Sequence, residues 1–121
     1  MITILLVDDD NLNRDMLTQH LKRKNYTVIT AVNGSEAVEI AEKELPNLIL
    51  MDMNMPMMDG LEATRQIKKN PLTAHIPIII LSGHDMPSYV AQAIAGGSDD
   101  YDTKPVNFER LFGKIQAILK K

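Results

Sequence analysis

The sequence of 121 residues contains no cysteine, so the chain can form no disulfide bond and no thiolate metal site. The absence of disulfides fits a cytoplasmic protein, and the cytoplasm is the location we expect. No apolar run approaches the roughly 20 residues of a membrane-spanning helix. Nor does a basic start lead into an apolar segment of the kind that marks a secretory signal. We therefore expect no membrane association.

An excess of positive charge is also missing. The chain has 13 lysine and arginine residues against 16 aspartate and glutamate residues, and its net charge is −3. The basic run Lys22-Arg23-Lys24 is interpreted as the solvated end of a helix, so we expect no direct contact with nucleic acid. Because no linker or low-complexity segment divides a chain of this length, we expect residues 1–121 to form a single domain.

Short apolar runs alternate with segments of helical spacing. The runs predict five strands, at Thr3–Val7, Tyr26–Ala31, Leu48–Met51, Ile76–Leu81 and, more weakly, Tyr101–Thr103. Strands that alternate with helices indicate an α/β protein with a parallel sheet covered on both faces. For five βα units, a common strand order is 2-1-3-4-5, which gives a flavodoxin-like three-layer sandwich.

Five helices are predicted from apolar positions that are three and four residues apart. Their predicted buried faces are Leu12, Met16, His20 and Leu21; Ala37, Val38, Ala41 and Leu45; Leu61, Thr64 and Ile67; Met86, Tyr89, Val90, Ala93 and Ile94; and Phe108, Leu111, Phe112, Ile115 and Leu119. Asn33-Gly34-Ser35 precedes the second segment as its expected turn and cap, and Asn107 is the expected N-cap of the last. Asp10 and Asp59 are interpreted as a capping or surface acid and as a turn and helix start, respectively.

Acidic residues follow two of the predicted strands. Asp8 and Asp9 come directly after the first strand, and Asp52 ends the third. Ligands of open parallel sheets bind beyond the carboxyl ends of the strands, where the strand order reverses, here between strands 1 and 3. The three carboxylates should therefore lie close together. Because they repel one another, we expect a bound cation, a bound proton or a role in chemistry at this site. A site of oxygen ligands without a histidine or cysteine cluster favours Mg²⁺ or Mn²⁺.

Two further polar groups are expected at the same edge of the sheet. Ser82 follows the fourth apolar run and supplies a hydroxyl, and Lys104 follows the fifth and supplies an ammonium. A carboxylate beside a metal can act as a nucleophile towards phosphorus. Metal, hydroxyl and ammonium together stabilise the charge of a phosphoryl group in transfer. The pattern therefore indicates phosphoryl transfer to a carboxylate.

Four motifs, in this order, resemble the receiver domain of bacterial two-component response regulators. They are Asp8-Asp9, Asp52-x-x-Met55-Pro56-x-Met58-Asp59-Gly60, Ser82-Gly83 and Lys104-Pro105, and the resemblance covers essentially the whole chain. It implies a signalling domain that receives a phosphoryl group from a sensor histidine kinase or a histidine phosphotransfer protein. Such a domain is no enzyme beyond its own phosphorylation and slow dephosphorylation, and its output passes through a downstream protein target.

The resemblance also implies a metal and acceptor site. Asp52 would be the phosphoacceptor, and Asp9 and Asp52 would bind Mg²⁺ directly. Asp8 would act through a water molecule or by its charge, and Asn54 would offer its backbone carbonyl to the metal.

The remaining matched positions concern the phosphoryl group and the response to it. Ser82 would donate to a phosphoryl oxygen, and Lys104 would pair with the phosphoryl charge. Pro105 would follow a cis peptide bond. Tyr101 would be the aromatic switch residue and would turn inward when Ser82 moves towards the acyl phosphate. The face formed by the fourth helix, fifth strand and fifth helix would then change its partner preference.

Several features remain open from the sequence. The resemblance assigns no role to Asp10, His84 or Asp102, and Asp102 is a charge where an apolar strand residue is common. The chain could act as a free regulator, as a phosphorelay shuttle or as part of a hybrid kinase. One alternative is an aspartyl-phosphate hydrolase of the haloacid-dehalogenase type, although Asn54 occupies the position of its second aspartate. The other is a flavodoxin-like cofactor binder, although acidic residues occupy its phosphate loop.

Overall fold

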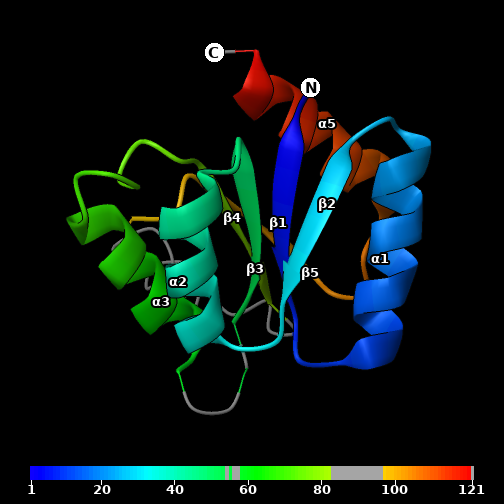
Figure 1. Ribbon diagram of the computed structural model, residues 1–121. Helices are drawn as coiled ribbons and strands as arrows, with labels where there is room; N and C mark the ends of the chain where they lie inside the picture. The colour runs from blue at the N-terminus through cyan, green and yellow to red at the C-terminus, as the bar shows by residue number, and fades with distance from the viewer. Residues whose placement is uncertain (54, 56–57, 83–96, 121) are drawn as a thin grey trace.

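The computed structural model describes residues 1–53, 55, 58–82 and 97–120 (Figure 1). Its elements are β1 (Thr3–Val7), α1 (Asn11–Arg23), β2 (Thr27–Ala31), α2 (Gly34–Glu44), β3 (Leu48–Asp52), α3 (Gly60–Lys69), β4 (Ile78–Ser82), β5 (Asp100–Thr103) and α5 (Phe108–Leu119). The helix predicted around Met86–Ile94 lies outside the described residues. No helix among the described residues is long and apolar enough to cross a membrane.

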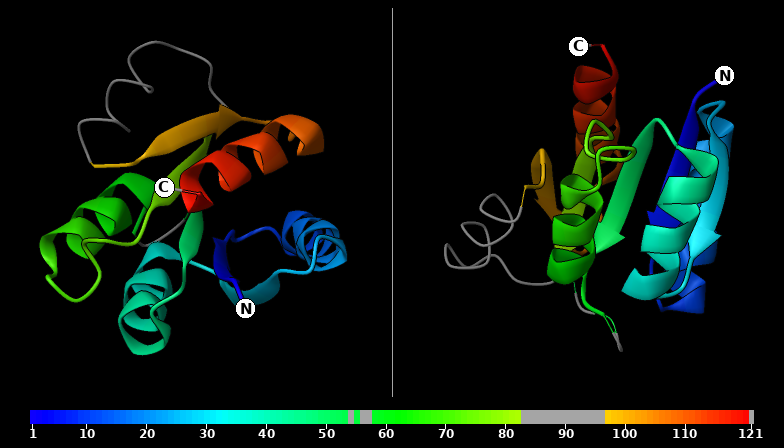
Figure 2. Two further views of the ribbon diagram at one scale, coloured as in Figure 1. Left: turned by 90° about the horizontal axis from the view of Figure 1, so that it is seen from above. Right: turned by 60° about the vertical axis from the view of Figure 1, so that its left-hand side comes forward.

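The five strands form one sheet in the order β2-β1-β3-β4-β5, and every pair of neighbours is parallel. The predicted α/β class and strand order are confirmed. Helices α2 and α3 cover one face of the sheet, and α1 and α5 cover the other (Figure 1, Figure 2). The reversal of strand order falls between β1 and β3, which places the carboxyl ends of these two strands side by side.

Each face of the sheet has its own apolar core. Alternate residues of a strand point to opposite faces, so Leu5 and Ile49 pack towards α2 and α3, whereas Leu6 and Leu50 pack towards α1 and α5. All four side chains are fully buried. Burial on both faces explains why the central strands are continuous apolar runs without alternation.

The predicted buried face of α1 is partly wrong. Leu17 and Leu21 face the core, whereas Leu12 is 80% and Met16 45% exposed. Each helical residue is rotated by about 100° from the one before, so Met16 points well away from the stripe through Leu17 and Leu21. The ring of His20 stacks on the ring of Phe108 in α5, with 3.7 Å between their centroids.

Leu45 is a second correction, because its side chain is 51% exposed instead of buried. It is the C-cap of α2 and has a left-handed backbone conformation, with φ 47°, which turns it away from the helix face. The predicted N-cap Asn107 is confirmed, and within the predicted cap Asn33-Gly34-Ser35 it is Asn33 that caps α2; each of the two asparagines accepts a hydrogen bond from a backbone N–H three residues later. Asp10 and Asp59 are also N-caps.

Candidate functional site

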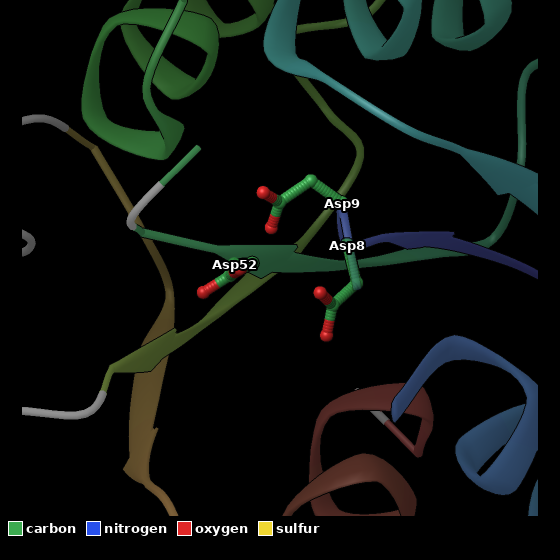
Figure 3. Close-up of side chains that lie close together, drawn as sticks. All are labelled: Asp8, Asp9 and Asp52. Atoms are coloured by element: carbon green, nitrogen blue, oxygen red, sulfur yellow. The ribbon is translucent and has the colours of Figure 1, made fainter. Parts of the chain in front are cut away.

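Three carboxylates meet at the carboxyl edge of the sheet. Asp8 and Asp9 follow β1, and Asp52 is the last residue of β3 (Figure 3). Because Val7 and Met51 are partners in the parallel register, the acidic residues that follow them emerge next to each other. One carboxylate oxygen from each of the three residues lies within 4.8 Å of the others. We call Asp8, Asp9 and Asp52 the acidic cluster.

Two members of the acidic cluster are buried. Asp8 is 1% and Asp52 3% exposed, whereas Asp9 is exposed to solvent. One oxygen of Asp8, Oδ1, accepts a hydrogen bond from the backbone N–H of Asp10 at 2.9 Å. The other, Oδ2, is buried and has no hydrogen-bond partner among the described residues. A buried carboxylate oxygen without a donor is unfavourable, so this atom is aimed at a cation.

A lysine that follows the edge strand β5 reaches the acidic cluster. Lys104 Nζ lies 3.1 Å from Asp52 Oδ1 and 3.8 Å from Asp8 Oδ2. Its backbone N–H donates to the carbonyl of Ser82 at 2.7 Å, which attaches the connection after β5 to the end of β4. One ammonium does not neutralise three carboxylates, so the site keeps an excess of negative charge.

The acidic cluster fits a small divalent cation. Its donors are all carboxylate oxygens, which Mg²⁺ prefers, and buried Asp8 Oδ2 accepts no hydrogen bond from the described residues. Mg²⁺ is typically held by one or two carboxylates and keeps other positions for water and phosphate oxygens. Asn54, the predicted source of a backbone carbonyl, lies outside the described residues.

Ser82 is the last residue of β4 and is 4% exposed. It lies one position beyond Leu81, which is the register partner of Asp52. Its hydroxyl donates to Met53 Sδ at 3.8 Å. The hydroxyl is therefore held at the same edge of the sheet as the acidic cluster and Lys104.

Comparison with known proteins decides the family. The family model for the response regulator receiver domain matches residues 4–116. The chain belongs to the response regulator receiver family. Receiver domains are signalling domains that take phosphate from histidine kinases, and this family is neither of the two alternatives considered from the sequence.

Individual relatives agree with this assignment. The chain is 39% identical over 119 residues to Protein PilH of Pseudomonas aeruginosa, with 98% of each chain covered. It is 35% identical to Response regulator PleD of Caulobacter vibrioides. The aligned 117 residues make up 97% of this chain and 26% of that protein. The chain thus spans nearly all of one relative and about a quarter of the other.

Solved structures give the same fold. A putative response regulator from Chloroflexus aurantiacus matches with a TM-score of 0.95 and 31% identity, over 99% of this chain and 98% of that one. The chemotaxis protein CheY4 of Vibrio cholerae matches with a TM-score of 0.92 and 31% identity, over 98% of each chain. The receiver domain of the sensor histidine kinase PA1611 of Pseudomonas aeruginosa, solved with a magnesium ion coordinated in its active-site cleft, matches with a TM-score of 0.93 and 30% identity, over 99% of this chain and 98% of that one.

The receiver domain carries its predicted switch residue, Tyr101, on β5, the edge strand of the sheet. The side chain is partly buried and packs against the core on the α2 and α3 face. Lys114 of α5 donates to the Tyr101 carbonyl and lies 5.0 Å from the centre of its ring. The peptide bond between Lys104 and Pro105 is cis.

Two glycines shape the receiver site in a way that sequence reasoning missed. A Cβ at Gly60 would lie 2.2 Å from the carbonyl oxygen of Asp52, and a Cβ at Gly34 would lie 2.3 Å from that of Met58. The start of α3 can therefore approach the end of β3 only with glycine at position 60. The pairs Asn33-Gly34 and Asp59-Gly60 were visible in the sequence, but they indicated only turns and helix starts.

Proposed function

We propose that this receiver domain accepts a phosphoryl group on Asp52 in a Mg²⁺-dependent reaction. The donor is a phosphohistidine on a sensor kinase or a phosphotransfer protein. The observation that carries the proposal is the meeting of three carboxylates with Lys104, which bonds Asp52 Oδ1 at 3.1 Å. We further propose that residues 1–121 act as one receiver domain in the cytoplasm, alone or within a larger protein.

Each residue of the site has a separate task in this proposal. Asp9 and Asp52 would bind Mg²⁺ directly, and buried Asp8 would contribute the negative charge that attracts it. Asn54 lies outside the described residues, and its backbone carbonyl would complete the protein ligands on the strength of the family alone. When bound, Mg²⁺ neutralises the carboxylate repulsion and the charge of the phosphoryl oxygens. Asp52 would then present one carboxylate oxygen as the nucleophile, which forms an O–P bond while the N–P bond of the donor's phosphohistidine breaks and the histidine imidazole leaves.

Lys104 and Ser82 serve the phosphoryl group. The Lys104 ammonium already lies against the acceptor carboxylate, so it can follow negative charge from Asp52 onto the phosphoryl oxygens. The Ser82 hydroxyl can turn from Met53 Sδ, a weak acceptor, to a phosphoryl oxygen, a strong one. Both groups thereby stabilise the phosphorylated state as well as the transfer.

Output passes through protein contacts in this proposal. When Ser82 turns to the phosphoryl group, Tyr101 moves inward and the face of the fourth helix, β5 and α5 changes its preference for a downstream protein. The fourth helix lies outside the described residues, and the proposal for it rests on the family. Tyr101 is only partly buried, which leaves its ring room to change position.

A cavity beside the site is the candidate docking surface for the donor protein, because two neighbours of Asp52, Asp8 and Lys104, line it. The cavity has a volume of about 570 Å³ and lies between α1 and the connection from β5 to α5. Asp8 and Lys104 form its polar wall, and Met16, Pro105 and Phe108 contribute apolar surface. A surface that is apolar around a charged centre suits a protein partner that delivers a phosphohistidine.

The test is incubation with acetyl phosphate and Mg²⁺, followed by intact mass measurement. We expect a single labile phosphoryl adduct that requires Mg²⁺ and is absent from Asp52→Asn. Asp59→Asn, which alters an exposed N-cap on the neighbouring loop, is the matched control and should keep the adduct. Repeated turnover of an unrelated phosphate ester without any adduct would contradict the proposal and favour a hydrolase.

A further inference from the structure

Asp102 is a buried charge that the proposed reaction does not use. It lies in β5, is 3% exposed, and is the register partner of Leu81. Leu81 belongs to the apolar core on the α1 and α5 face, together with Leu111 and Ile115 of α5. A carboxylate in these surroundings is unfavourable unless cations and donors compensate it.

The compensation comes from the first turns of α5, but it is incomplete. Arg110 Nε lies 2.7 Å from Asp102 Oδ1, and Lys114 Nζ lies 4.0 Å from the same oxygen. Asp102 Oδ2 is buried without a hydrogen-bond partner among the described residues. Apolar pairs of similar volume are often as stable as ion pairs with a buried partner, and here the buried carboxylate keeps an unsatisfied oxygen while Arg110 is half-exposed. Fold stability therefore does not account for the charge at position 102.

The contacts of the pair converge on one short segment. Asp102 Oδ1 accepts from the backbone N–H of Thr103 at 2.8 Å, and Arg110 Nη2 donates to the carbonyl of Thr103 at 3.4 Å. The backbone of Arg110 is itself fixed, because its N–H donates to the N-cap Asn107 at 3.1 Å. The pair thus spans the connection from β5 to α5. It binds both the N–H and the carbonyl of Thr103, the residue before Lys104.

We propose that Asp102 and Arg110 are positioning residues for Lys104. Their ion pair fixes the backbone of Thr103, and the hydrogen bond from the Lys104 N–H to the Ser82 carbonyl fixes the backbone of Lys104 itself. Together these contacts aim the lysine side chain at Asp52, 3.1 Å away. The consequence for phosphorylation rests on the proposed function, whereas the positioning of Lys104 does not.

The double variant Asp102→Val/Arg110→Leu tests the proposal. It replaces the ion pair with an apolar pair, so the protein should fold with a melting temperature equal to or above that of the wild type. Phosphorylation of Asp52 by acetyl phosphate should nevertheless slow by about tenfold, because small displacements of a catalytic group reduce rates strongly. Arg110→Lys keeps a cation and should recover most of the rate, whereas Arg110→Gln should not.

Amide hydrogen exchange provides a readout that is independent of phosphorylation. In the metal-free double variant, the amides of Thr103 and Lys104 should exchange at least tenfold faster, while that of Leu50 in β3 should keep its wild-type rate. A purely structural pair would change all three amides together or none. Arg65→Leu removes an exposed arginine of α3 and is the matched control, with no change expected in either readout.

The outcomes separate the two proposals. Wild-type exchange at Thr103 and Lys104, or a wild-type phosphorylation rate in the double variant, would overturn the positioning role. If the wild type itself takes no phosphoryl group, the proposed function fails, and the exchange data still decide whether the pair holds Lys104. If the double variant does not fold, Arg110→Gln against Arg110→Lys gives the same comparison at a half-exposed side chain.

Discussion

Two groups of charged side chains lie near the carboxyl ends of the strands, each built around buried carboxylates, and they differ in charge balance. The acidic cluster holds three carboxylates against the ammonium of Lys104. Asp102, by contrast, faces two cations of α5 and is joined directly to one of them. An excess of negative charge can be relieved by a cation from solution, whereas the charge of Asp102 is already matched by cations of the same fold, although one of its oxygens lacks a hydrogen bond among the described residues. The first arrangement indicates a binding site, and the second indicates an ion pair that fixes the backbone between β5 and α5.

The difference predicts opposite effects on stability when a charge is removed. Arg110→Leu leaves buried Asp102 with Lys114, 4.0 Å away, as its one remaining cation among the described residues. Breaking a fully buried pair lowers the free energy of unfolding by roughly 3–5 kcal/mol, and we expect about 2 kcal/mol here because Arg110 is partly exposed. Urea denaturation measures this change.

Arg65→Leu is the control for the Arg110 variant, and its free energy of unfolding should stay within about 0.5 kcal/mol of the wild type. Equal changes in the free energy of unfolding for the two substitutions would mean that the Asp102–Arg110 pair does not stabilise the fold. That result would contradict the proposed difference between the two charged groups.

Added Mg²⁺ should stabilise the protein through the acidic cluster. At ten times its dissociation constant, a ligand that binds only the folded state adds about 1.4 kcal/mol to the free energy of unfolding. Asp9→Asn should lose most of this gain, because it removes a direct ligand. Asp15→Asn, at an exposed position of α1, should keep it. Thermal melts with and without Mg²⁺ provide the measurement, and an equal gain in both variants would place the ion elsewhere.

Removing a charge from the acidic cluster should have the smallest effect and the opposite sign. Without metal, Asp52→Ala relieves repulsion with Asp8 and Asp9 but loses the contact with Lys104. We expect the free energy of unfolding in EDTA to rise by about 1 kcal/mol, since close charges at partly screened sites interact by several kcal/mol. Asp15→Ala is the matched control. A strong destabilisation by Asp52→Ala would show that the three acids do not repel one another.

The sequence predicted the sheet and the acidic cluster well for physical reasons. Strands buried on both faces must be continuously apolar, and acids that follow such strands must emerge at one edge of a parallel sheet. The buried face of α1 was harder to predict from the sequence. Met16 and Leu17 are both apolar, and only packing against the sheet determines which of them is buried. Leu45 was misassigned because the helix ends there in a left-handed residue, which apolar spacing does not indicate.

Other features of the site depend on contacts that no local pattern contains. Asp102 looked like a departure from a regular strand, yet β5 keeps its parallel register through Asp102. Its partner Arg110 lies beyond a connection whose course the sequence does not fix. The close approach of Gly60 to the Asp52 carbonyl is likewise a property of the folded chain.

The most direct test of the central claim is to locate the phosphoryl group chemically. After incubation with acetyl phosphate and Mg²⁺, borohydride reduction converts an aspartyl phosphate to homoserine, and peptide mass mapping finds the altered residue. We predict homoserine at position 52 only, and none when EDTA replaces Mg²⁺. Homoserine at another acidic residue, or at position 52 without any divalent ion, would contradict the account.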